Sequence, residues 1–164
     1  MKDLNLPQRK HPRLKNYDYS ASGSYFITIC TVEKKCILGQ ISSRNDINTA
    51  PKTVLSDIGK ISKKYLDSMV SVYSDVKIEN YVIMPNHIHV LLTLCGYDKS
   101  AKKKTDLFQI IKAYKRLTAR EIGYQIWQES YYDEIIKDNL HFQNVWDYIE
   151  FNECKWEDDK YFLP

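Results

Sequence analysis

The sequence is poor in cysteine, and its cysteines are badly spaced for binding a metal. Only four occur in 164 residues, and no two of them form a CxxC pair. This spacing excludes the thiolate zinc sites of zinc fingers and ribbons, and it gives no disulfide framework. We therefore expect a reduced, cytoplasmic protein in which the cysteines pack as small apolar side chains. They are Cys30, Cys36, Cys95 and Cys154.

Long apolar runs and a strong net charge are also missing. The opening residues, MKDLNLPQRKHPRLK, are polar and contain no apolar signal core, and no run has the length of a membrane span. No association with a membrane is therefore expected. The net charge of +3 is too small to indicate an anionic partner, so the position of the cations matters more than their sum.

Apolar and aromatic residues, in contrast, are plentiful. Apolar residues make up 43% of the chain, which includes 13 tyrosines. A chain of this length and composition buries a real core, so we expect one folded domain over residues 1–164. Residues 1–16 are basic and are interpreted as an arm.

Hydrophobic periodicity predicts an α+β fold. Runs typical of strands lie at 24–32, 75–84 and 87–94, and helical repeats begin near Ser56 and Leu107. A last helix is expected over about 140–153, and the preceding stretch, WQESYYDEIIKDN, is interpreted as a link. This order predicts helices on one face of an antiparallel sheet.

The strand predicted at 87–94, HIHVLLTL, has two unlike faces. Side chains alternate along a strand, so His87 and His89 share one face, and the residues between and after them make the other face wholly aliphatic. The aliphatic face must be core. The imidazoles lie roughly 7 Å apart along the strand, so both can reach one metal ion. Two hydrogen-bonded histidines at a strand end are the common meaning of such a pair, so a metal site requires a third ligand.

The predicted last helix offers such a ligand and a nucleophile. Tyr148 and Asn152 are four residues apart and share a stripe with Val145 and Ile149, which indicates a face docked on the sheet. The asparagine carbonyl can be a neutral metal ligand, and the tyrosine would then stand close to whatever the metal binds. A tyrosine that packs in a core and an asparagine that caps a helix remain the alternatives.

Several segments together resemble a known family. YVIMPNHIHVLL, WQESYYDEIIKD and VWDYIEFN resemble the single-tyrosine HUH transposases and look closest to their REP-associated tyrosine transposase branch. RLKNYDYSASGSYFITICT is similar to the opening of that branch, so the likeness extends from Arg13 to about Trp156. The chain departs from the branch at Asn152-Glu153, where the branch often has Asn-Pro, and in its short C-terminus. Substrate preference therefore does not carry over.

The resemblance implies a ferredoxin-like, RNA-recognition-type sheet with HUH endonuclease architecture. In that family the two histidines and a polar residue one turn after the tyrosine hold a divalent metal, Mg²⁺ or Mn²⁺. Those positions are His87, His89 and Asn152 here, and the nucleophile is Tyr148. The implied enzyme is a transposase that cuts single-stranded DNA beside hairpins and leaves a 5′-phosphotyrosine and a free 3′-hydroxyl. Related transposases dimerise whereas the REP-associated branch is monomeric, so both states stay open.

Cations on the helix that begins near Leu107 offer a surface for this DNA partner, although a solvated helix face is the usual meaning of such a run. The arm, with Arg13 and Lys15, corresponds to one that reads the hairpin flank in the family. The helix flank consists of Lys112, Lys115, Arg116 and Arg120.

Two other functions remain open beside the DNA-cleaving enzyme. The scaffold would be a binding module if it held hairpin DNA without cutting it, or a metallohydrolase if a water molecule replaced Tyr148 as nucleophile. Tyr131 and Tyr132 are rival nucleophiles, but Asp133 and Glu134 beside them would oppose a phosphate. Tyr148 is therefore preferred.

Overall fold

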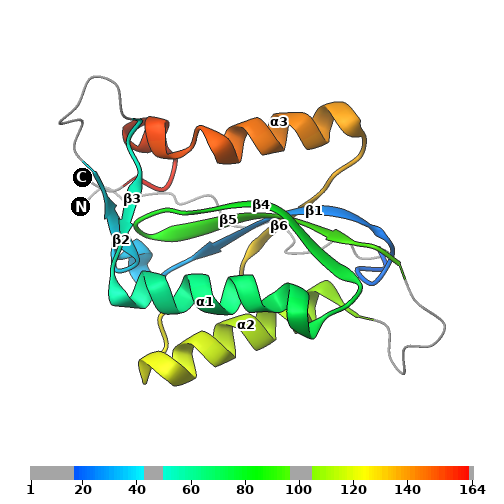
Figure 1. The fold of residues 1–164 in the computed structure, drawn as a ribbon, viewed down its shortest axis with the longest axis horizontal. Coiled ribbons are helices and arrows are strands. Elements are labelled where there is room, and N and C mark those ends of the chain that lie inside the picture. The colour runs from blue at the N-terminus through cyan, green and yellow to red at the C-terminus, as the bar shows by residue number, and fades with distance from the viewer. Residues whose placement is uncertain (1–16, 43–49, 97–104, 163–164) are drawn as a thin grey trace, which may run out of the picture.

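The computed structural model describes residues 17–42, 50–96 and 105–162. Its centre is an antiparallel sheet with the strand order β4-β5-β1-β6 (Figure 1). The chain passes through a helix between β1 and β4 and through another between β5 and β6. This is the ferredoxin-like arrangement, so the predicted fold class is confirmed. The strands are β1 (Gly23–Cys30), β4 (Val76–Ile83), β5 (His87–Leu94) and β6 (Tyr132–Ile135).

Helices cover both faces of this sheet. In Figure 1, α1 (Asp57–Val72) and α2 (Leu107–Ile122) lie on one side, and α3 (Asn139–Glu150) lies on the other. The expectation of helices on one face therefore holds for α1 and α2 and is wrong for α3. The reason is that β1 is apolar on both faces, since Ile27 and Phe26, which point in opposite directions, are both buried. Each face requires its own cover.

Two apolar cores result, one on each side of the sheet. The larger core joins α1 and α2 to the aliphatic face of β5, where Ile88, Val90 and Leu92 are fully buried, as predicted. The smaller core joins α3 to the other face through Leu91, Val145 and other apolar side chains. His87 and His89 lie on this second face, because they alternate with the aliphatic residues. The histidine face is therefore the one under α3.

Side-chain caps mark the first turns of α1 and α2. The Ser56 side chain accepts a hydrogen bond from the Gly59 N–H at the start of α1, and the Asp106 side chain accepts one from the Phe108 N–H at the start of α2. Helix α2 ends at Gly123, whose φ of 94° suits glycine. No helix in the described ranges is both long enough and apolar enough to cross a membrane.

Two predictions from the sequence are wrong. The stretch interpreted as a link contains β6, a short strand on the edge of the sheet. Before α1, β2 (Gly39–Ile41) pairs with β3 (Thr53–Leu55) in a separate sheet. Cys30 is buried, as expected, but the other three cysteines are exposed.

Candidate active site

The two histidines of β5 form a buried pair. Both side chains are fully buried, and their Nε2 atoms lie 3.0 Å apart. The pleat of β5 directs both rings to the α3 face, as the alternation of its sequence predicts. Two ring nitrogens so close together can serve one ion, which was the geometry expected from the spacing.

Tyr148 stands beside this pair. Its hydroxyl lies 3.3 Å from His89 Nε2 and donates to Asp159 Oδ2, also at 3.3 Å. Helix α3 brings the tyrosine here by docking Val145 and Ile149 on the sheet, as the stripe predicted. The side chain remains 39% exposed, so the phenol can meet a macromolecular substrate.

Asn152 lies just beyond α3, where a short 3-10 segment (Glu153–Asp158) begins. The side chain is buried, and its Nδ2 donates to Asp159 Oδ2 at 3.4 Å. Its Oδ1 has no hydrogen-bond partner among the described residues. A buried carbonyl oxygen without a partner is costly, so this atom is suited to a ligand that the chain itself does not supply.

The sequence analysis missed Asp159. Ligand atoms of His87, His89 and Asp159 all lie within 4.8 Å of one another. Asp159 follows the 3-10 segment and has no place in a strand or helix. No periodicity marks such a position, and an acidic residue in a charged stretch gives no local signal. The site therefore offers two nitrogen and two oxygen side chains from two distant parts of the chain.

Burial determines the protonation of these groups. Burial, with Lys160 and Lys34 as lesser causes, lowers the pKa of His87 to about 3. The pKa of His89 is also well below its usual value, again chiefly through burial. Both imidazoles are neutral at pH 7, which is the form that binds metals. Burial and the nearby Asp159 carboxylate raise the pKa of Tyr148 to about 12, so the phenol is protonated.

A second tyrosine, which the sequence analysis did not consider, covers the histidine pair. The ring centroid of Tyr161 lies 4.6 Å from that of His87 and 6.0 Å from that of His89. Two ammonium groups approach this ring, with Lys34 Nζ at 5.2 Å and Lys160 Nζ at 5.0 Å from its centroid. The site is therefore bordered by positive charge on the side of Tyr161.

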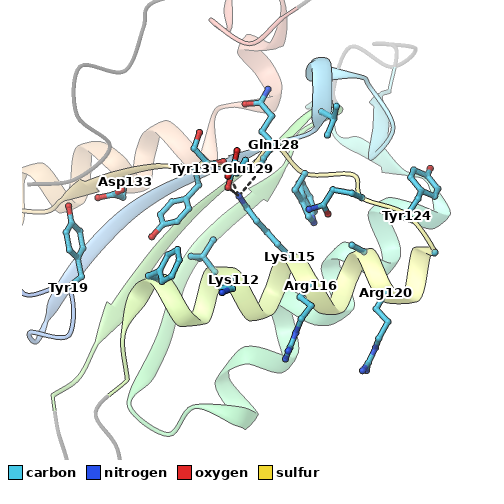
Figure 2. A pocket seen from close by; sticks show the side chains of 18 of the residues that line it. Tyr19, Lys112, Lys115, Arg116, Arg120, Tyr124, Gln128, Glu129, Tyr131 and Asp133 are labelled. Atoms are coloured by element: carbon cyan, nitrogen blue, oxygen red, sulfur yellow. Dashed lines mark hydrogen bonds between the residues drawn. The ribbon is translucent and has the colours of Figure 1, made fainter.

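Of the predicted basic flank, three members lie where expected. Lys112, Arg116 and Arg120 are exposed and line an open groove along α2 (Figure 2). Aromatic side chains, among them Phe108 and Tyr124, line the same groove. None of the three cations forms a salt bridge within the described part of the chain. Arg13 and Lys15 lie outside the described residues.

Lys115 does not belong to this flank, and that part of the prediction is wrong. The side chain is only 8% exposed, and its Nζ donates to the backbone carbonyls of Gln128, Glu129 and Ser130 at 2.9–3.3 Å. Figure 2 shows it directed toward this loop, whereas Arg116 and Arg120 point away from it. Its described contacts are those of a residue that fastens the loop before β6.

The rival tyrosines are placed differently from Tyr148. Tyr131 is buried in the larger core, on the opposite side of the sheet from the histidines. The hydroxyl of Tyr132 donates to Glu134, whose carboxylate would repel a phosphate, as the sequence indicated. Neither observation favours these residues as nucleophiles.

The chain is similar to a known sequence and to solved structures. No protein-family profile matches the chain. An uncharacterized protein of Haemophilus influenzae (strain KW20) is 28% identical over an alignment of 181 positions, which covers 98% of this chain and 97% of that one. A solved structure of a candidate transposase from Deinococcus radiodurans R1 is 18% identical, with a TM-score of 0.49, and covers 86% of this chain and 98% of the other.

The structure of a REP-associated tyrosine transposase bound to a REP hairpin is also 18% identical. The match has a TM-score of 0.60 and covers 87% of this chain and 73% of the other. The resemblance in the sequence is thereby supported at the level of the fold. The chain has the fold of the REP-associated tyrosine transposase.

Proposed function

We propose that the protein is a metal-dependent transposase that cuts single-stranded DNA beside hairpins, with Tyr148 as the nucleophile. The observation that carries this proposal is the position of the Tyr148 hydroxyl, 3.3 Å from an imidazole of the buried histidine pair and 3.3 Å from a carboxylate. A tyrosine that serves only for packing also bonds its hydroxyl locally, but the 39% exposure of Tyr148 leaves it accessible to a substrate. The fold shared with a REP-associated tyrosine transposase supports the same function.

The residues present fit a divalent metal. His87 and His89 are neutral and buried, Asp159 supplies an oxygen close to both, and Asn152 Oδ1 is a buried acceptor without a partner among the described residues. Two nitrogen and two oxygen donors suit Mn²⁺ better than Mg²⁺, which prefers oxygen ligands alone. Activity with either ion is expected, with tighter binding of Mn²⁺. A bound ion would supply Lewis-acid stabilisation of the phosphoryl oxygens.

The chain's own residues account for the bond changes. The Tyr148 oxygen attacks the phosphorus, the bond from phosphorus to the 3′-oxygen breaks, and the 5′-phosphate stays on the tyrosine. The phenol proton passes to Asp159 Oδ2, the acceptor at 3.3 Å, and the departing 3′-oxygen takes a proton from water. One phosphate ester replaces another, so the strand can be rejoined without ATP. The absence of a glycine-rich phosphate loop from the sequence agrees with this.

A positive surface for the DNA partner lies along α2, on the face of the sheet opposite the histidines (Figure 1). Lys112, Arg116 and Arg120 repeat every four residues along α2, which places them about 6 Å apart along the helix axis. Aromatic side chains in the same groove can stack on unpaired bases. This flank would hold phosphates of the hairpin, and the arm with Arg13 and Lys15 would contact the hairpin flank.

The test compares two tyrosines of one site. The protein and its Tyr148→Phe and Tyr161→Phe variants are incubated with Mn²⁺ and labelled single strands that span the hairpins beside its own gene. A denaturing gel then shows whether labelled DNA is attached to protein. We expect a metal-dependent adduct that Tyr148→Phe abolishes and Tyr161→Phe retains. Tyr161→Phe is the matched control, because it also loses one hydroxyl beside the histidine pair.

The other outcomes contradict the proposal in different ways. An adduct that disappears in Tyr161→Phe but not in Tyr148→Phe would move the nucleophile to the other tyrosine. Cutting that survives in both variants without an adduct would indicate a metallohydrolase. Tight binding of several strands, with neither cutting nor adduct, would indicate a binding module.

A further inference from the structure

We propose that Asn86 and Thr28 hold the two metal-site histidines in different tautomers. His87 then always has a lone pair on Nε2 for a metal. His89 gains one only when its proton moves from Nε2 to Nδ1. This inference rests on the metal site of the proposed function. Neither Asn86 nor Thr28 is a candidate ligand, so both are positioning residues.

Asn86 determines which ring nitrogen of His87 carries the proton. The asparagine is fully buried, and its Nδ2 donates to two backbone carbonyls, those of Lys34 at 3.1 Å and Tyr161 at 2.8 Å. These two bonds use both hydrogens of the amide, so the orientation of the amide is fixed. Its Oδ1 then faces His87 Nδ1 at 2.8 Å and can only accept. His87 therefore carries its proton on Nδ1 and has a lone pair on Nε2.

The position of the proton on His89 follows from its position on His87. The two Nε2 atoms lie 3.0 Å apart, and two lone pairs at this distance would repel each other. Because His87 Nε2 is unprotonated, His89 Nε2 must carry a proton and donate it. His89 Nδ1 is then an acceptor, and the Thr28 hydroxyl, 2.8 Å away, donates to it.

If both histidines held a cation through Nε2, both of these nitrogens would have to be unprotonated. The proton of His89 must leave Nε2 and reappear on Nδ1 of the same ring, so no proton is released overall. Thr28 Oγ1 then accepts a hydrogen bond from the His89 Nδ1–H, which a hydroxyl can do by rotating. Asn86 and His87 do not change.

Asn86 also links the site to the rest of the molecule. Its backbone carbonyl accepts from both the N–H and the hydroxyl of Thr31, directly after β1. Its side chain reaches Lys34 and Tyr161, so one residue fastens three segments around His87. The asparagine of the sequence MPNHIH thus has a defined role, because it prevents His87 from taking the other tautomer.

The first test is a two-bond ¹H–¹⁵N NMR experiment on the histidine side chains, which reports each tautomer without any DNA. In the metal-free protein we expect His87 protonated on Nδ1 and His89 on Nε2, with assignments from His87→Gln and His89→Gln. Titration with Zn²⁺, a diamagnetic ion that binds imidazole, should convert His89 alone, so that both rings are protonated on Nδ1. Identical tautomers before metal is added, or a change at His87, would overturn the inference.

The second test measures Zn²⁺ affinity by calorimetry. Thr28→Val removes the hydroxyl that accepts the hydrogen bond from His89 Nδ1–H, and we expect a 10- to 100-fold loss of affinity. Thr28→Ser should restore most of it. The matched control is Thr93→Val on β5, whose hydroxyl bonds Ser24 and not a histidine, and whose affinity should stay unchanged. Equal affinity in Thr28→Val and Thr93→Val would refute the role of Thr28.

These measurements separate the inference from the function on which it rests. The metal-free spectrum tests the two tautomers even if the protein never cuts DNA. If Zn²⁺ does not bind at the histidines, the proposed metal site is wrong and the proton shift of His89 is wrong with it. If Zn²⁺ binds and the tautomers are as expected but no adduct forms with DNA, the inference holds and the proposed nucleophile fails.

Discussion

The two faces of the central sheet differ in what they bury. Toward α1 and α2, strand β5 presents aliphatic side chains that need no specific orientation to pack. Toward α3, the same strand presents two imidazoles, each tied by directional hydrogen bonds. Adjacent residues of one strand therefore serve different purposes. The aliphatic face stabilises the fold, and that stability permits the polar face to hold buried groups that would otherwise weaken it.

The largest expected effect comes from a pair of neighbours on β5. Leu92 faces α1 and α2, Leu91 faces α3, and both are fully buried. Replacing either with alanine should lower the free energy of unfolding by about 3 kcal/mol, because each leaves a cavity in a packed core. Urea unfolding measures this effect.

The same pair sharpens the contrast between the faces. At a temperature where both variants are folded, Leu92→Ala should form the DNA adduct at the normal rate, whereas Leu91→Ala should be slower, since it loosens the support of α3. Equal adduct rates in the two variants would mean that the faces are not separate in function.

A smaller effect is expected from pH. Burial lowers the folded-state pKa of His87 to about 3, below its usual value of 6.5, so the unfolded chain binds the extra proton between these values. The free energy of unfolding is therefore highest above pH 6.5, where the imidazole is neutral in both states, and it decreases as the pH falls. At pH 5 the loss through His87 is about 2 kcal/mol. His89 acts in the same direction.

Urea unfolding of the metal-free protein at pH 7, 6 and 5 measures this dependence. His87→Gln should reduce it, because a glutamine does not titrate. An unchanged free energy of unfolding between pH 7 and pH 5 in the original protein would show that the histidine face is not desolvated as described.

The smallest effect concerns the surface, where α1 and α2 differ as the two faces do. Lysines of α1 are paired with carboxylates, as in Lys63 with Asp67 and Lys64 with Glu121. The exposed cations of α2 form no such pairs among the described residues. Alanine at Lys112, Arg116 and Arg120 should make the plot of log affinity for single-stranded DNA against log salt less steep by roughly 2.

The matched control removes three lysines from α1. It consists of Lys60→Ala, Lys63→Ala and Lys64→Ala, which change the net charge equally. The slope should stay the same, because these charges are already neutralised. If both triple variants flatten the slope equally, net charge and not the α2 groove controls binding.

The sequence was sufficient for parts of this picture that depend on regular alternation. A period of two separates His87 and His89 from the aliphatic residues of β5, and a period of 3.6 puts Tyr148 on the stripe that docks α3. It failed at β6, where two acidic residues in a short edge strand resemble a link.

Other failures have a different cause, because the decisive contacts are distant in the chain. Lys115 follows the spacing of a basic flank, but the carbonyls of a later loop bind it. Asp159 reaches the histidines from an irregular segment, and nothing in its local sequence distinguishes it from the acidic residues beside it. Periodicity describes a face of one element, not what another element brings to that face.

The residues of the site are far apart in the sequence, so the ribosome synthesises them at different times. Tyr148 follows His89 by 59 residues, and Asp159 comes later still. A nascent chain therefore contains its histidine pair before Tyr148 has been synthesised, and the site is assembled only when α3 packs on the sheet. On the proposed mechanism, a polypeptide released before Tyr148 and Asp159 are made would contain the histidine pair but could not cut DNA.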